Sequence, residues 1–73
     1  MALTKQDLEE IFTYHVPEPF QIPAYNRVRD AARVFAVTIL DETPACADQS
    51  AAIRLLREAV MTANAAIALK GRV

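Results

Sequence analysis

The sequence has few of the residues, cysteine and histidine, that stabilise small folds through disulfides or metal sites. Its 73 residues include one cysteine, Cys46, and one histidine, His15. One cysteine cannot close a disulfide within the chain, and a structural zinc site needs more ligands than these two residues provide. At this length a single core supplies only about 3–5 kcal/mol of net stability, so natural chains add a disulfide, a metal or a partner subunit. The sequence therefore predicts a homo-oligomer.

Glycine, net charge and long apolar runs are also scarce. Gly71 is the only glycine, which excludes the Gly-rich loops that cradle phosphates in many nucleotide-binding folds. The net charge is −1, so the chain lacks the domain-wide basic face of proteins that coat DNA or RNA. No run approaches the roughly 18 apolar residues of a membrane span, and none resembles a signal peptide. A lone thiol suits a reducing cytoplasm, and we expect neither a nucleic-acid polymer nor a membrane as partner.

The sequence also lacks a catalytic set. An enzyme needs a nucleophile–base pair, paired carboxylates or a group of metal ligands. His15 stands beside a proline break with no partner fixed by spacing, and Cys46 is interpreted as a packing residue rather than a reactive thiol. Asp41 and Glu42 adjoin a chain break and are interpreted as solvated loop acids. The sequence therefore predicts a non-catalytic protein with no metal site and no cofactor.

The sequence does contain the capping residues and the spacing of apolar residues that are typical of α-helices. Thr4 and Asp7 have the spacing of a capping box, and Pro17 stops the apolar periodicity that follows. These signals predict a short helix over about residues 4–14. Two longer helices are expected over about residues 20–42 and 48–70, separated by a Thr-Pro break. Their predicted core stripes are Tyr25, Val28, Ala32, Phe35 and Ile39, and Ile53, Leu56, Val60, Ala63 and Ile67.

The predicted architecture is all-α: a short N-terminal helix followed by an antiparallel helical hairpin, in a single domain over residues 1–73. Both long helices carry more apolar surface than one neighbour can cover. From Ala59 to Leu69 only Thr62 and Asn64 are polar. Such surplus favours self-association through closed symmetric contacts, and two well-capped patterns argue against a partly molten hairpin.

Several polar and aromatic residues favour ligand binding. Tyr14 and His15 adjoin the proline-rich connection, where rings stay accessible, and a base stacks on such rings with about 1–3 kcal/mol. Arg29 and Arg33 lie four residues apart and share a helix face, and guanidinium groups suit phosphate oxygens. Asn64, if buried, needs a partner. Each residue alone is more often structural, but together they favour a small anionic ligand.

Several strings of the sequence resemble one protein family. They are Phe12-Thr13-Tyr14-His15, Pro17, Tyr25 with Val28-Arg29, Thr43-Pro44, Ala51-Ala52-Ile53, Leu56–Met61 and Ala63–Ala68. Over about residues 12–70 the chain resembles the phage anti-CBASS cyclic-oligonucleotide sponges, which are related to the hairpin domain of the Thoeris anti-defence sponges. Thr62 departs from the tryptophan often found in related sequences, and residues 45–48 form an unusual loop. Both departures bear on the ligand spectrum more than on the fold.

The resemblance implies a concrete function. Family members assemble as helical hairpins, commonly into hexamers, and hold cyclic di- or trinucleotides or cyclic ADP-ribose isomers without cleaving them. In the cytoplasm of the infected bacterial host, this sequestration would keep immune effectors inactive. The resemblance implies that Tyr14 stacks on a base at a subunit boundary and that Arg29 contacts phosphate. The remaining candidate ligand-binding residues are His15 and Asn64, from the same resemblance, and Arg33, Arg54 and Lys70, from charge and helix position.

Two other classes of function remain as alternatives. One is a structural or protein-interaction hairpin oligomer without a nucleotide ligand, in which the Arg and Tyr residues are surface residues of a helix bundle and bind no ligand. The other is a hydrolase of cyclic nucleotides, which is motivated only by His15 and nearby acids.

Overall fold

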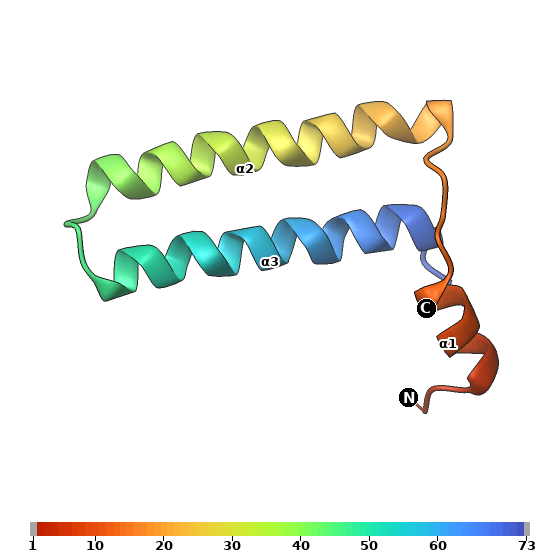
Figure 1. Cartoon of the computed structure of the whole chain (residues 1–73). Coiled ribbons are helices and arrows are strands. Elements are labelled where there is room, and N and C mark those ends of the chain that lie inside the picture. Colours follow the sequence, from red (N-terminus) through yellow and green to blue (C-terminus); the bar gives the residue numbers. More distant parts are fainter. Residues whose placement is uncertain (1, 73) are drawn as a thin grey trace.

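A computed structural model describes residues 2–72, and within that range it contains helices but no strand. The helices are α1 (Lys5–Phe12), the 3-10 helix η1 (Pro19–Gln21), α2 (Ile22–Glu42) and α3 (Ala47–Leu69). Figure 1 shows α2 and α3 side by side and antiparallel, with α1 beyond the end of the hairpin near the C-terminus of α3. The predicted all-α helical hairpin is confirmed.

The short N-terminal helix is held by local hydrogen bonds. The capping box is confirmed, because the Thr4 amide donates to Asp7 Oδ2 (2.9 Å) and the Asp7 amide donates to Thr4 Oγ1 (3.1 Å). α1 ends at Phe12, two residues before the predicted end, because Thr13 is extended and its hydroxyl donates to the Glu9 carbonyl (2.6 Å). No residue of α1 is buried.

The hairpin is closed by small and branched residues along the facing sides of α2 and α3. The half-buried residues of this interface include Val28, Ala32 and Ala36 on α2 and Leu56 and Val60 on α3. Phe35, predicted in the core stripe, is 56% exposed, so that part of the prediction is wrong. Successive residues are 100° apart on a helix, and Phe35 and Ala36 each line a different hollow between α2 and α3, whereas Ala32 lines both and lies at the centre of the contact. An alanine there lets the two backbones approach closely.

The turn between α2 and α3 is fixed by side chains of its own. The Thr43 hydroxyl donates to the Ile39 carbonyl (2.6 Å), and Gln49 Nε2 donates to the Thr43 carbonyl (3.1 Å). Cys46 occupies the N-cap position of α3 and is exposed. The interpretation of Cys46 as a packing residue is therefore wrong, because the turn places it beyond the end of the helix interface.

The single chain has almost no interior. Among residues 2–72, Leu69 is the only buried hydrophobic residue and Gln21 the only buried polar one. The chain measures 45 × 30 × 18 Å, and its shortest dimension is less than the width of two packed helices, each about 10–12 Å across. Large apolar side chains therefore remain exposed on every helix, among them Leu8, Phe20, Val34, Leu40, Leu55 and Met61. None of the described helices is long and apolar enough to cross a bilayer.

Candidate ligand-binding groove

One side of the hairpin carries a groove with an apolar floor and a basic rim. It has a volume of about 380 Å³, within the range of about 300–1,000 Å³ that small-molecule sites occupy. Arg29 and Arg33 of α2 and Arg57 of α3 belong to its lining, and no acidic residue does. The rest of the lining is apolar: Ala32, Ala36, Ile53, Leu56, Val60 and Met61. An apolar floor beside several guanidinium groups suits a flat ring attached to phosphate.

The three arginines line the same groove because of the helix periodicity of α2 and the alignment of α3 against α2. Arg29 and Arg33 are one turn apart on α2 and therefore point to the same side. Arg29 donates to Asn26 Oδ1 (3.3 Å), and Arg33 Nη1 lies 3.8 Å from Asp30 Oδ1. The Arg33–Asp30 pair is weak, since both side chains are more than two-thirds exposed. Both arginines can therefore turn to an anion at little cost.

Arg57 was not among the predicted site residues. It is exposed, and its side chain makes no hydrogen bond or ion pair with any residue from 2 to 72. Its place opposite Arg29 and Arg33 depends on how α3 is aligned against α2. In the sequence, Arg57 lies within the string Leu56–Met61 that carries the family resemblance, and its position four residues before Met61 puts both on one face of α3.

Arg29 also lines a second hollow. This hollow lies under the prolyl connection, has a volume of about 330 Å³, and is otherwise lined by Pro17, Ile22, Tyr25 and Asn26. Tyr14 is 80% exposed on the connection and lines neither hollow. A single chain therefore does not bring the predicted stacking ring into the hollows that contain Arg29.

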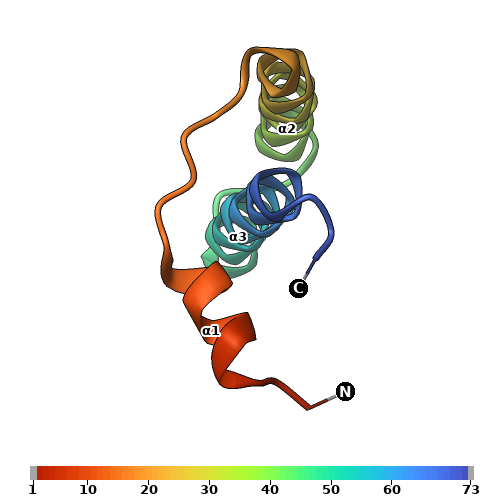
Figure 2. The ribbon, with the colours of Figure 1, turned by 90° about the vertical axis from the view of Figure 1, so that its right-hand side faces the viewer.

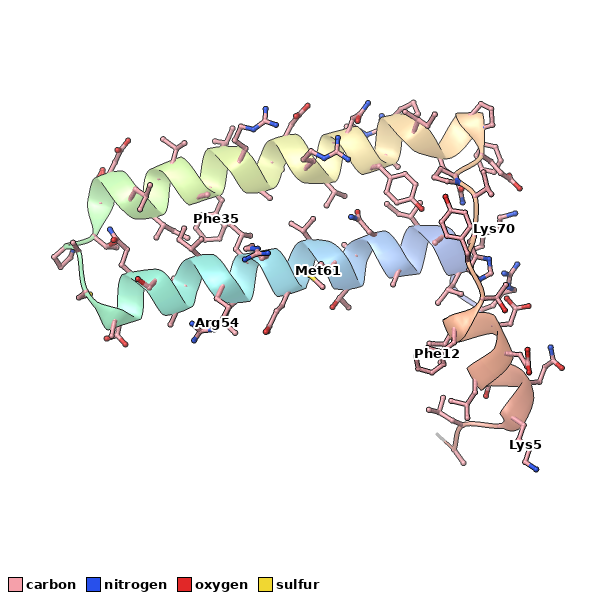
Figure 3. All side chains as sticks on the ribbon, viewed as in Figure 1. Lys5, Phe12, Phe35, Arg54, Met61 and Lys70 are labelled. Carbon is pink, nitrogen blue, oxygen red and sulfur yellow. The ribbon has the colours of Figure 1, made fainter. Side chains whose placement is uncertain are left out.

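His15 and Lys70 lie outside the groove and contact the chain itself. His15 Nε2 is 2.7 Å from the Glu10 carbonyl, and because a carbonyl only accepts, this nitrogen carries the hydrogen. Lys70 Nζ donates to Glu18 Oε1 (3.2 Å) and lies 6.0 Å from the centre of the Phe20 ring. Figure 3 shows Lys70 at the end of α3, beside the connection that leads to α2. A ligand-binding role for His15 and Lys70 stays a prediction.

Asn64 and Arg54 occupy different sides of α3. Asn64 is half-buried, and its Oδ1 is buried without a donor within residues 2–72. An unsatisfied buried acceptor costs about 1–3 kcal/mol, so this atom is available to a donor from a ligand or another chain. Arg54 points from α3 away from α2 (Figure 3) and does not line the groove. Within residues 2–72 no cluster of His, Cys, Asp or Glu could hold a metal ion.

The fold and the groove together define a small helical ligand-binding module. Residues 4–68 match the family described as the Acb2/Tad1 hairpin domain. The chain therefore belongs to this family of anti-CBASS and anti-Thoeris sponges, which bind cyclic nucleotides, and the predicted family is confirmed. Comparisons with curated proteins and with solved structures gave no match.

Proposed function

We propose that this protein binds and sequesters cyclic nucleotide signals without cleaving them, so that CBASS or Thoeris effectors stay inactive in the infected host cytoplasm. The candidate ligands are cyclic di- and trinucleotides and cyclic ADP-ribose isomers. The observation that carries the proposal is the groove in which Arg29, Arg33 and Arg57 surround an apolar floor with no acidic residue in the lining. Membership of a family of cyclic-nucleotide sponges gives the class of ligand.

The chemistry of the groove fits a cyclic dinucleotide. Such a ligand presents two phosphate diesters and two flat bases. Guanidinium groups on α2 and α3 can form charge-assisted hydrogen bonds to the phosphate oxygens, and the apolar floor can cover the face of a base. A sponge needs high occupancy at low ligand concentration, so nanomolar affinity, about −12 kcal/mol, is the relevant scale. Turnover has no place in this function.

We propose further that the protein acts as a homo-oligomer, with a hexamer as the predicted size. The supporting observation is an apolar groove between α2 and α3, distinct from the arginine-lined groove and from the hollow under the prolyl connection. It is lined entirely by apolar residues: Val28, Ala31, Ala32, Phe35, Leu56, Ala59, Val60 and Ala63. This surface carries no charge to oppose contact with another copy, whereas arginines line the other groove. Contact through the apolar groove would cover Phe35 and leave the arginine-lined groove open to ligand.

The residue roles in this proposal follow from their positions. Arg29, Arg33 and Arg57 bind phosphate oxygens, and Asn64 accepts a hydrogen bond from the ligand or from a neighbouring chain. Tyr14 is exposed and lies outside both hollows that contain Arg29. We therefore propose that Tyr14 stacks on the base of a ligand bound at a subunit boundary. His15, Arg54 and Lys70 remain predicted ligand-binding residues that the groove does not include.

Calorimetry with a panel of cyclic di- and trinucleotides and cyclic ADP-ribose isomers tests the proposal. We expect at least one compound to bind the unmodified protein in the nanomolar range, and we expect Arg29→Ala to weaken that binding. Arg27→Ala is the matched control, because Arg27 is exposed on the same helix but lines neither hollow. Failure of the whole panel to bind would favour a structural or protein-interaction hairpin. Conversion of a bound compound would identify a hydrolase.

A further inference from the structure

The N-terminal segment is tied to the hairpin by three side-chain hydrogen bonds. Gln21 Nε2 donates to the Ile67 carbonyl (2.9 Å), Lys70 Nζ donates to Glu18 Oε1 (3.2 Å), and Arg72 Nη2 donates to Glu10 Oε2 (2.7 Å). These bonds span 46 to 62 positions in the sequence. Every other side-chain hydrogen bond among residues 2–72 spans six positions or fewer.

All three bonds end at the same place, the last turn of α3 and the residues after it. Figure 2, a view along the hairpin, shows why: α3 lies between α1 and α2, and the connection passes beside α3 on its way from one to the other. Apolar packing along this connection is slight, because Tyr14, Val16 and Phe20 are all at least 71% exposed. The path of the connection is therefore set by polar contacts.

Gln21 is the central one of these contacts. It is 7% exposed, and both ends of its amide are used. Gln21 Oε1 accepts from the Glu18 amide (3.0 Å), which closes the first turn of η1, while Nε2 reaches a carbonyl in the last turn of α3. The Ile67 carbonyl also accepts from the Lys70 amide at the end of α3 (3.2 Å), so Gln21 supplies a second donor to the last turn of the helix.

The two ion pairs contribute less than Gln21. The side chains of the Lys70–Glu18 pair are 46% and 45% exposed, and those of the Arg72–Glu10 pair are 47% and 34% exposed. Exposed pairs of this kind are screened by water and salt. The side chain of Gln21 is only 7% exposed, so its hydrogen bonds are better shielded from water, and their loss removes the side-chain acceptor of the Glu18 amide.

We propose that Gln21 is a positioning residue for ligand binding, and that it acts by holding the connection that carries Tyr14. This inference rests on the proposed function, in which Tyr14 stacks on a base. A ring on a fixed connection is already ordered before the ligand arrives, whereas a ring on a free connection must be ordered during binding, which lowers affinity. The Lys70–Glu18 and Arg72–Glu10 ion pairs assist Gln21, because they hold the same segment against the end of α3.

Gln21→Met is the first test, because methionine has a similar length but cannot form either hydrogen bond. We expect backbone ¹⁵N order parameters of residues 13–18 to fall while those of α2 and α3 stay unchanged. Unchanged order parameters in residues 13–18 would overturn the inference whatever the ligand. For 3′,3′-cyclic GMP–AMP as the probe, we expect affinity about tenfold weaker, the equivalent of about one net hydrogen bond.

A double-mutant cycle separates positioning from general destabilisation. If Gln21 acts through Tyr14, Gln21→Met weakens binding in the unmodified protein but hardly at all in a Tyr14→Ala background. Equal losses in both backgrounds would refute positioning of Tyr14. Intact affinity in Tyr14→Ala itself would count against the proposed stacking role of Tyr14, and failure of the whole panel to bind the unmodified protein would count against the proposed function; in either case the order parameters would still decide the structural claim.

Gln21→Glu keeps the test decisive if the methionine variant does not fold. The introduced carboxylate can still accept from the Glu18 amide, but it places an oxygen without hydrogen against the Ile67 carbonyl. Protonation restores a donor, so the order parameters of residues 13–18 in this variant should approach those of the unmodified protein as pH is lowered. A difference between the two proteins that does not change with pH would contradict the role of the Gln21–Ile67 bond.

Discussion

Arg57 provides a sharp test of the groove, because the structure places it there although it was not among the predicted site residues. It lines the groove from α3, opposite Arg29 and Arg33. Its side chain makes no hydrogen bond or ion pair with residues 2–72 and is exposed. Arg57→Ala therefore removes little from the fold, and we expect a change in stability within about 0.5 kcal/mol.

The effect on binding should be much larger. A hydrogen bond to a charged group contributes about 1.5–3 kcal/mol, and about 1.4 kcal/mol corresponds to a tenfold change in affinity. Because the groove is open to water, we expect the lower end of this range, which is about a tenfold loss. Arg57→Lys keeps the charge but loses the planar fork that matches phosphate, so its affinity should lie between those of Arg57→Ala and the unmodified protein.

Calorimetry at low and high salt measures both the loss and its origin. We expect the difference in ligand affinity between Arg57→Ala and the unmodified protein to decrease as salt is added, because screening weakens the contribution of the guanidinium group. Arg27→Ala, which removes the same charge from outside the groove, should bind almost as well as the unmodified protein. Equal affinities of the Arg57→Ala and Arg27→Ala variants would refute the placement of the ligand in this groove.

Three further predictions concern Tyr14, Phe35 and Asn64. Tyr14→Ala should weaken cyclic-dinucleotide binding by about 1–3 kcal/mol, the usual value for one stacked base, in calorimetry; unchanged affinity would mean that another residue stacks. Phe35→Lys should reduce the mass measured by light scattering to that of one chain, since it places a charge in the apolar groove; a retained oligomer would show that the contact lies elsewhere. Asn64→Ala should leave the thermal midpoint of ligand-free protein unchanged or higher, because Oδ1 has no donor within residues 2–72; a clear drop would reveal a partner in the assembly.

The elements of the fold are encoded locally, and for that reason the sequence predicts them well. Thr4 and Asp7 are close in sequence, and their capping box forms as their spacing indicates. The rotation of α2 about its axis, in contrast, is not determined by local sequence. Its second half is apolar almost all round, and the pattern placed Phe35 in the core stripe although this side chain is more than half exposed. Packing against α3 sets this rotation, and it leaves Ala36 half-buried and Phe35 exposed.

The candidate site depends more strongly on distant parts of the chain. Arg29 and Arg33 share a face by spacing alone and were predicted, but Arg57 joins them only through the alignment of the hairpin. Gln21 was missed because its partner is a backbone carbonyl 46 positions away. Every residue type has such a carbonyl, so no sequence pattern marks the pairing.

The most direct test of the central claim is the fate of the bound ligand. Purified protein is incubated for hours with a stoichiometric amount of the tightest-binding cyclic nucleotide, unbound ligand is removed, and the protein is denatured by heat. We expect chromatography and mass spectrometry to recover the ligand intact and in an amount close to that bound. Recovery of a linear or otherwise altered nucleotide would contradict sequestration without cleavage.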